Sequence, residues 1–400
     1  GRTGVIKKYC GYFECIPWAE RHSCKAVMKP SIFALCLAAT TLVGCQNPVR
    51  DPIDSVVQVV SDPQQEIQKG RRQYPFALAQ SGGDLTQFPE TTHYLNDLIQ
   101  RLAKTASSPF PWEIRLINDS SINAWALPGG KMGVNYGLIN AVETEAELVS
   151  VLGHEMAHSI ELHGTGRETF GALIGLAAQV IEIGVSEPGT KPGSNKLIGL
   201  GQNMLMGQYS QSNELEADRV GVDLMVRAGF DPTGAVGMQE KLAELGAGGN
   251  SVAQKLLGTH PISRERLAAI RTEVAKYPNQ GQITSPEFTR AKAEIQSRES
   301  GLTLISDARK KGAEEEFRSA LSLTTRALKI LPNEHSAWRL HAELLVANQQ
   351  PREAIESALR VRDLNSSDPI SELLLGYCYE ASGDNIQATR ARERAKALMR

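Results

Sequence analysis

The stretch "VLGHEMAHSIELHG", residues 151–164, restricts the fold of this chain more than any other. It places two histidines four residues apart, with a glutamate directly after the first, inside an otherwise apolar segment. On an α-helix, His154 and His158 lie about 6 Å apart along the axis and nearly on one face, so both imidazoles can reach a single ion. Glu155 is then close enough to touch a water on that ion without binding the ion itself. The pattern predicts a metal-binding helix with a general base; a buried helix with hydrogen-bonded histidines is the alternative.

Acidic residues that can complete such a site lie in "NELEADRVG", residues 213–221. Glu214 and Asp218 are four residues apart and share one face of a predicted helix, whereas Glu216 points elsewhere. One carboxylate can bind the metal while a second, one turn away, orients a ligand histidine. Two imidazoles and a carboxylate favour zinc. The alternative is a solvated acidic helix face.

Extended segments are few and short. "WEIRLIND" (112–119) alternates in polarity as a strand does, and "INAWALPGGKMGVNYGLINAV" (122–142) places a Pro-Gly-Gly turn between two extended segments. Helical periodicity covers five further segments, at 62–80, 91–106, 145–163, about 200–228 and 236–245. We therefore expect an α+β domain over residues 62–285, mainly helical with a small β-sheet.

The C-terminal part contains an internal repeat. Two segments that begin at Arg326 and Leu359 align at a period of about 34 residues, which is the tetratricopeptide spacing. In this alignment Leu345 matches Tyr379 and Ala354 matches Ala388. Each unit would be a helical hairpin that buries its apolar face only against a neighbour. We expect an all-α repeat domain over residues 286–400; a plain helical bundle is the alternative.

The first methionine, Met28, begins "MKPSIFALCLAATTLVGCQN". Its apolar run is too short for a membrane span but suits a signal peptide. The residues before Cys45 resemble a bacterial lipobox, so we expect an upstream segment at 1–27, a signal peptide at 28–44 and a tether at 45–61, lipidated on Cys45. A mature chain would keep only Cys45 and Cys378, which excludes an intramolecular disulfide. An ordinary cleaved signal or a short buried helix is the alternative.

The composition adds little about function. The 400 residues carry a formal net charge of −2, and only 6% of them are aromatic. Neither value indicates a nucleic-acid-binding surface. The length allows two or three domains.

Three motifs together resemble a known family. "HEMAH", "ELEAD" roughly 55 residues later, and "NAWALPGG" before the helix resemble the zinc metallopeptidases related to HtpX and the CAAX prenyl proteases. The resemblance implies a zincin-type metalloprotease domain with one zinc ion per chain on His154, His158 and Glu214. It also implies Glu155 as the general base and Asp218 as support for a ligand histidine. Because the mature part of this chain shows no spanning helices, prenylated substrates are not implied.

Further residues follow from the same resemblance. In repeat-carrying periplasmic members, a histidine in a matching Thr-His-Pro loop can fill the open position of the zinc. Carried over to "THPISRERL" (259–267), His260 would be a regulatory fourth ligand and Arg266 an oxyanion donor. Simple anchoring of this loop is the alternative for both.

Substrate binding is assigned to the predicted hairpin. Its strand can pair with an extended peptide through backbone hydrogen bonds, which gives little sequence selectivity. The candidate substrate-strand residues are Asn123, Ala124, Pro128, Gly129 and Gly130. A core hairpin without an exposed edge is the alternative. The apolar segment 170–183 could be a lid or a membrane-facing patch, and otherwise an ordinary buried helix.

The predicted function is that of a zinc-dependent endopeptidase in the bacterial periplasm. It would be lipid-anchored at the inner leaflet of the outer membrane and cleave misfolded or stalled outer-membrane proteins. Its partners would be unfolded envelope proteins and, through the repeats, the outer-membrane assembly machinery; no nucleic acid is expected. The alternative is an assembly chaperone or adaptor that acts through its repeats, with a mostly latent protease site.

Overall fold

A three-stranded β-sheet lies beside the helix that carries the HEMAH motif. The computed structural model describes residues 62–161, 209–249 and 252–399. The strands are β1 (Glu113–Ile117), β2 (Ala124–Leu127) and β3 (Lys131–Asn135), in the order β1-β3-β2. β2 and β3 form the predicted hairpin, and β1 pairs with β3 in parallel. β2 is therefore an edge strand of this sheet.

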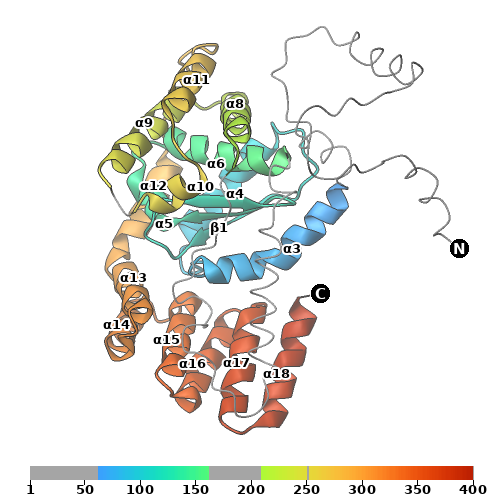
Figure 1. Ribbon diagram of the computed structural model, residues 1–400, viewed down its shortest axis with the longest axis vertical. Helices are drawn as coiled ribbons and strands as arrows, with labels where there is room; N and C mark the ends of the chain where they lie inside the picture. Colours follow the sequence, from blue (N-terminus) through green and yellow to red (C-terminus); the bar gives the residue numbers. More distant parts are fainter. Residues whose placement is uncertain (1–61, 162–208, 250–251, 400) are drawn as a thin grey trace, which may run out of the picture. The chain divides into compact units, whose positions relative to one another are not determined.

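The hairpin turn requires its glycines. Gly129 and Gly130 have φ angles of +73° and +81°, which side chains disfavour. Helix α3 (Pro63–Gln80) packs closely against the turn, since a Cβ on Gly129 would lie 2.5 Å from the Cα of Ile67. In Figure 1, α3 lies below the sheet and helix α6 above it.

Helix α6 (Glu145–Ile160) is the central helix of this domain. Its side chains are buried almost all round, as in a core helix, and Thr144 caps its first turn by accepting a hydrogen bond from the Glu147 amide. The helix ends at Ile160, three residues before the predicted end. Because water is excluded, its polar side chains need partners within the protein.

Seven more helices pack around the sheet and α6. They are α4 (Pro89–Ala103), α5 (Tyr136–Ala141), α8 (Gln211–Arg227), α9 (Thr233–Ala247), α10 (Gln254–Thr259), α11 (Arg264–Val274) and α12 (Pro286–Ser297). Helices α8 and α9 pack directly on α6, and α11 packs on both of them. α12 packs against α4 and α5, although the predicted repeat region begins at its first residue, so the boundary at 285/286 stays a prediction.

The remaining helices pack in chain order, as expected for an all-α region. They are α13 (Glu299–Ala313), α14 (Phe317–Ile330), α15 (His335–Ala347), α16 (Pro351–Leu364), α17 (Pro369–Ala381) and α18 (Asn385–Leu398). α15 and α17 begin 34 residues apart (369 − 335), and so do α16 and α18 (385 − 351). The structure thus confirms the α+β fold class and the C-terminal helical hairpins.

Buried polar contacts tie these helices to the end of α3, to the segment between α3 and α4, and to the residue that follows β1. Glu334 accepts hydrogen bonds from the amides of Thr86 and Gln87 at 3.0 and 3.1 Å. Arg309 donates to the carbonyls of Asn118 and Gly82, and Arg339 donates to the carbonyl of Ala79 at 3.2 Å. We call Arg309, Glu334 and Arg339 with these partners the polar joint. The polar joint fixes α13 and α15 to α3 and to the loops that follow α3 and β1.

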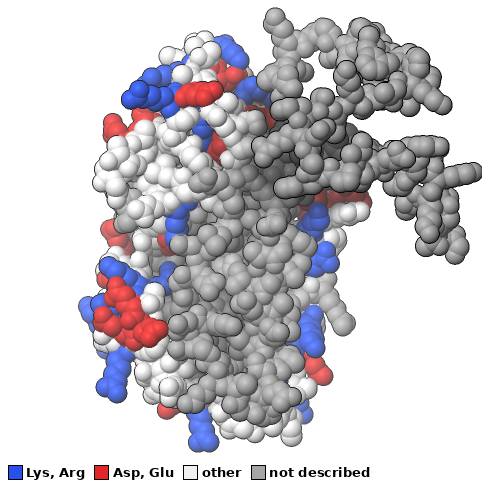
Figure 2. Space-filling view, viewed as in Figure 1, with Lys and Arg blue, Asp and Glu red and all other residues white. Residues whose placement is uncertain are grey.

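The described surface carries mixed charge. Figure 2 shows basic and acidic side chains interspersed on one face. Among the described residues, no helix is long and apolar enough to cross a membrane.

Several predictions fall on residues outside the described ranges. They concern the signal peptide, Cys45 and its tether, the apolar segment 170–183, and the predicted loop at 186–196. Cys378 is described, and its thiol is free and buried.

Candidate metal centre

A pair of glycines lets the two motif-bearing helices approach closely. A Cβ on Gly153 would lie 3.0 Å from the carbonyl oxygen of Gly221, and a Cβ on Gly221 would lie 2.9 Å from the amide nitrogen of His154. Larger residues would push α6 and α8 apart. The crossing therefore places Glu214 and Asp218 of α8 opposite the histidines of α6.

Four side chains converge at this crossing. The Nε2 atoms of His154 and His158 are 3.0 Å apart, and Glu214 Oε1 lies 3.2 Å from His158 Nε2. His260, which follows α10, brings its Nδ1 to 2.9 Å from Glu214 Oε1 and 3.3 Å from His154 Nε2. One ligand atom from each of the four residues lies within 4.8 Å of all the others.

These separations fit a tetrahedral zinc ion. Ligand atoms at ordinary zinc distances lie about 3.4 Å from one another around a tetrahedron. The four pairs above span 2.9 to 3.3 Å, and His154 Nε2 is 3.5 Å from Glu214 Oε2. Three imidazoles and one carboxylate also form a donor set that zinc accepts. The residues present therefore fit the metal.

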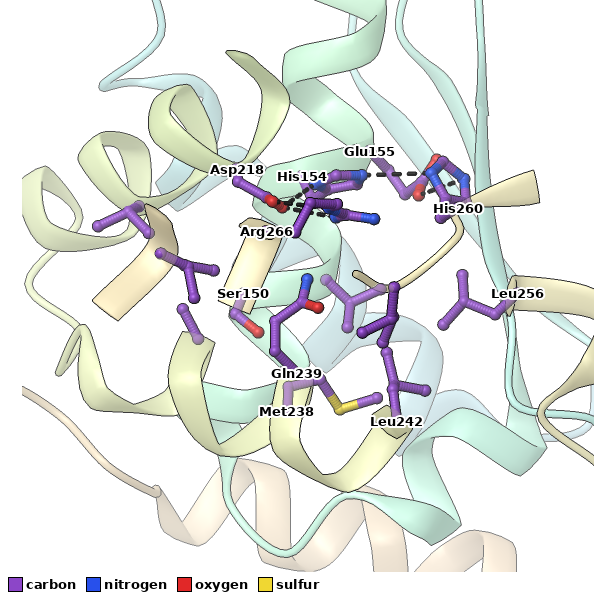
Figure 3. Close-up of a pocket in the computed structure, with 15 residues that line it drawn as sticks. Ser150, His154, Glu155, Asp218, Met238, Gln239, Leu242, Leu256, His260 and Arg266 are labelled. Atoms are coloured by element: carbon purple, nitrogen blue, oxygen red, sulfur yellow. Dashed lines mark hydrogen bonds and ion pairs between the residues drawn. The ribbon is translucent and has the colours of Figure 1, made fainter. Parts of the chain in front are cut away.

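Asp218 and Arg266 support this group from one side. Asp218 Oδ1 lies 2.9 Å from His154 Nδ1, the ring nitrogen that faces away from the ligand cluster. Arg266 of α11 donates to both oxygens of Asp218, at 2.8 and 2.9 Å, and its Nη1 lies 2.6 Å from Glu214 Oε2 (Figure 3). Nη1 also donates to the carbonyl of Pro261. The guanidinium is thus engaged with residues of the centre, and its predicted oxyanion role stays a prediction.

Charges at the site follow from burial and from these partners. Burial opposes ionisation of Glu214 and Asp218, but their hydrogen bonds outweigh it and hold both pKa values below their ordinary range. Burial likewise opposes a charge on His154, yet Asp218 and Glu214 raise the pKa of that imidazole to about 10. For His158, burial dominates and lowers the pKa well below its usual value. Asp218 thus increases the basicity of the one ligand histidine that it touches.

Glu155 faces the same cluster but is not part of it. Its Oε1 lies 3.4 Å from His260 Nε2, and the backbone of Ala126 in β2 is close enough to lower the pKa of its carboxyl. Burial raises the pKa of Glu155 above its ordinary value. A buried carboxyl with a raised pKa, next to a ligand cluster, suits proton transfer.

Tyr209 is a neighbour that the sequence patterns did not indicate. Its ring stacks on His158 with centroids 3.7 Å apart, and it lies 5.2 Å from the ring of His260. Its amide donates to the carbonyl of Thr259, directly before His260. Tyr209 therefore packs a metal-facing histidine and the His260 segment together.

The predicted substrate strand lies beside Glu155. Ala124 begins β2, and the carbonyl of the preceding Asn123 accepts the Asn135 amide. Pro128, Gly129 and Gly130 form the turn to β3. The Leu127 carbonyl at the end of β2 accepts a hydrogen bond from Ser159 Oγ at 3.2 Å, which ties this strand to α6.

The chain is similar to known peptidases over the residues that form this centre. Residues 89–274 match the family model described as peptidase family M48. The beta-barrel assembly-enhancing protease of Escherichia coli (strain K12) is 29% identical over 280 residues, which cover 66% of this chain and 56% of that protein. The metalloprotease LoiP of the same organism is 28% identical over 255 residues, covering 59% and 93%. The mitochondrial metalloendopeptidase OMA1 of Schizosaccharomyces pombe is 32% identical over 192 residues, covering 46% and 54%. The chain spans just over half the length of the first of these relatives.

Proposed function

Residues 89–274 form a peptidase family M48 domain, and from this premise we propose that the chain is a zinc-dependent endopeptidase. The convergence of His154, His158 and Glu214 beside the buried Glu155 carries the proposal. A purely structural zinc site would have no use for a buried carboxyl beside its ligands. Here His260 stands at the fourth position, next to Glu155.

The residues divide the chemistry among them. His154, His158 and Glu214 would hold the zinc ion, which supplies the Lewis acidity that activates a water and polarises a peptide carbonyl. Glu155 would accept a proton from the water and return it to the leaving amine. Asp218 would orient His154, and Arg266 would hold both carboxylates of α8 in position.

The edge strand β2 would bind the substrate. A peptide that extends the sheet there would run past Glu155, because the backbone of Ala126 in β2 lies near that carboxylate. Backbone pairing selects for extended, unfolded chains rather than for a sequence. Asn123, Ala124 and the turn residues Pro128, Gly129 and Gly130 remain the proposed contact residues.

His260 would act as a latch. Its Nδ1 lies among the ligand atoms, and its Nε2 lies 3.4 Å from Glu155. A histidine in this position would exclude the metal-bound water and would at the same time interact with the general base Glu155. Substrate binding would have to displace it.

We place the protein in the bacterial envelope. Two relatives are named as a beta-barrel assembly-enhancing protease and a metalloprotease, and the lipobox at Cys45 supports a lipid anchor at the outer membrane. Substrates would be misfolded or stalled envelope proteins, and the tetratricopeptide-like helices α13–α18 would dock them or the assembly machinery. The alternative role as an adaptor is not favoured, because the names of these relatives describe proteases.

The experiment compares zinc content and casein cleavage for wild type and Glu155→Gln. We expect about one zinc per chain in both proteins, and cleavage that falls by two orders of magnitude or more in the variant. Glu161→Gln, just after α6, is the matched control and should cleave like the wild type. Zinc binding without cleavage in any protein would contradict the proposal.

A further inference from the structure

An apolar cavity opens directly beside the proposed metal centre. It encloses about 500 Å³ of empty space, part of it open to solvent, between α6, α8, α9 and the segment 256–270. Figure 3 shows His154, Glu155 and His260 at one end of this cavity, with Met238 and Leu242 of α9 and Leu256 of α10 lining the remainder. The apolar lining residues are Val151, Val222, Ala235, Met238, Leu242, Leu256, Ile262 and Ile270.

The metal centre and the cavity share their boundary. His154 and His260 belong to the ligand cluster and also line the cavity, and Glu155 lines it beside them. Val151, one helical turn before His154, continues the same wall. A peptide whose scissile carbonyl faces Glu155 would therefore have a neighbouring side chain within reach of this space.

One polar atom in the wall lacks a partner. Gln239 of α9 is 91% buried (9% exposed), and its Oε1 makes no hydrogen bond. Figure 3 shows its amide group extending from α9 toward Arg266. An unsatisfied buried carbonyl is costly, and most such groups in folded proteins have a partner. It is a place where a bound ligand can donate an N–H group.

We propose that this cavity is a specificity pocket that accepts one large aliphatic or aromatic side chain of the substrate next to the scissile bond. Gln239 Oε1 would accept a backbone N–H of the bound peptide. The inference rests on the proposed endopeptidase function and adds to it a substrate class, namely chains with an exposed large apolar residue. Backbone pairing at β2 would select unfolded segments, and the pocket would select where they are cut.

Binding of peptide hydroxamates to the zinc-loaded protein tests the pocket without catalysis. The probes carry hydrogen, methyl, isobutyl or benzyl as the side chain next to the chelating group. Kd is measured calorimetrically for the wild type and for His260→Ala, in which the fourth position is open. We expect isobutyl or benzyl probes to bind at least about tenfold more tightly than the methyl probe.

Two substitutions fill the cavity from different helices. Ala235→Leu and Ser150→Leu, at a buried and a half-buried position, should each reduce the isobutyl-over-methyl preference to about twofold or less. Ala247→Leu makes the same change at an exposed position of α9 and should keep the preference. If Ala235→Leu does not fold, the side-chain preference of Ser150→Leu decides whether the cavity binds the side chain.

The outcomes separate this proposal from the previous one. Equal affinity for all four probes, no probe binding in either protein, or a preference that survives both filling variants would overturn the pocket. A side-chain preference without any peptide cleavage would support the pocket and contradict the endopeptidase. Cleavage of casein without a side-chain preference would support the endopeptidase function and contradict the pocket.

Discussion

Arg266 holds Asp218 through two parallel hydrogen bonds, from Nε to Oδ2 at 2.9 Å and from Nη2 to Oδ1 at 2.8 Å. Such a bidentate pair fixes the plane of the carboxylate as well as its position. Because Asp218 Oδ1 also lies 2.9 Å from His154 Nδ1, the orientation passes from α11 through α8 to the imidazole on α6. His154 Nε2 is thereby aimed at the ligand cluster.

Replacing Asp218 should weaken metal binding. Asp218→Asn keeps the shape but removes the charge that raises the pKa of His154. Loss of such a partner typically costs 10- to 100-fold in metal affinity. We expect a zinc Kd higher by roughly that factor, measured by competition with a chromophoric chelator. Asp223→Asn, at an exposed site on the same helix, should leave the Kd unchanged; equal values for both variants would mean that Asp218 does not orient His154.

Arg266→Ala separates a positioning role from an oxyanion role. A positioning residue would lower zinc affinity, because Asp218 and Glu214 would both lose their guanidinium contact. We expect an increase in the zinc Kd of about tenfold or more, and largely retained kcat once zinc is saturating. An oxyanion donor would give the opposite pattern, with kcat lower by about 10²-fold and an unchanged zinc Kd. Arg271→Ala, an exposed arginine of α11, is the control.

Removing the latch residue should increase proteolysis. In His260→Ala the fourth position opens and Glu155 loses its imidazole neighbour at 3.4 Å. We expect casein cleavage to rise several-fold at saturating zinc, with zinc affinity reduced because one donor is gone. Unchanged or lost activity in the zinc-saturated variant would contradict the latch.

Local spacing indicated the residues that the two motif-bearing helices contribute to the centre, whereas His260 and Arg266 were indicated only by the family resemblance. Positions four apart on one helix must share a face, so His154 with His158, and Glu214 with Asp218, could be paired before the fold was known. The same holds for the β2–β3 hairpin, whose Pro-Gly-Gly turn is local. The expected resemblance to metallopeptidases is confirmed by the peptidase family M48 match over residues 89–274, and the α+β fold is confirmed.

Features that depend on tertiary packing had no local pattern. The Gly153–Gly221 crossing sets which turn of α8 meets which turn of α6, and these positions are 68 residues apart (221 − 153). Tyr209 lies just before α8 and Gln239 lies on α9, and neither belongs to a spacing pattern that indicates the site. The parallel pairing of β1 with β3 likewise depends on long-range contacts.

Glu343 lies behind the polar joint, fully enclosed between Arg339 and α17. Its Oε1 is 3.5 Å from Arg339 Nε. Burial and, to a smaller extent, the charge of Asp368 together raise the pKa of this carboxyl to about 7. The charges of Arg339 and Arg309 oppose this increase. Asp368 itself has a raised pKa for the same reason, whereas Asp84, bonded to His335, has a lowered one.

Glu343 should therefore make stability fall as pH rises from about 4.5 to about 7. In this window the folded protein retains a proton that the unfolded chain has released, so the stabilisation present at low pH is lost as pH passes the folded pKa. At about 1.4 kcal/mol per pKa unit, the loss amounts to about 3 kcal/mol. Glu343→Gln mimics the neutral form; we expect it to match the wild type at pH 5 and to exceed it in urea unfolding at pH 8, with zinc saturating throughout. Glu353→Gln, at an exposed position of α16, should give no pH-dependent difference. A variant less stable than the wild type at pH 8 would instead mean that Glu343 is ionised and paired with Arg339.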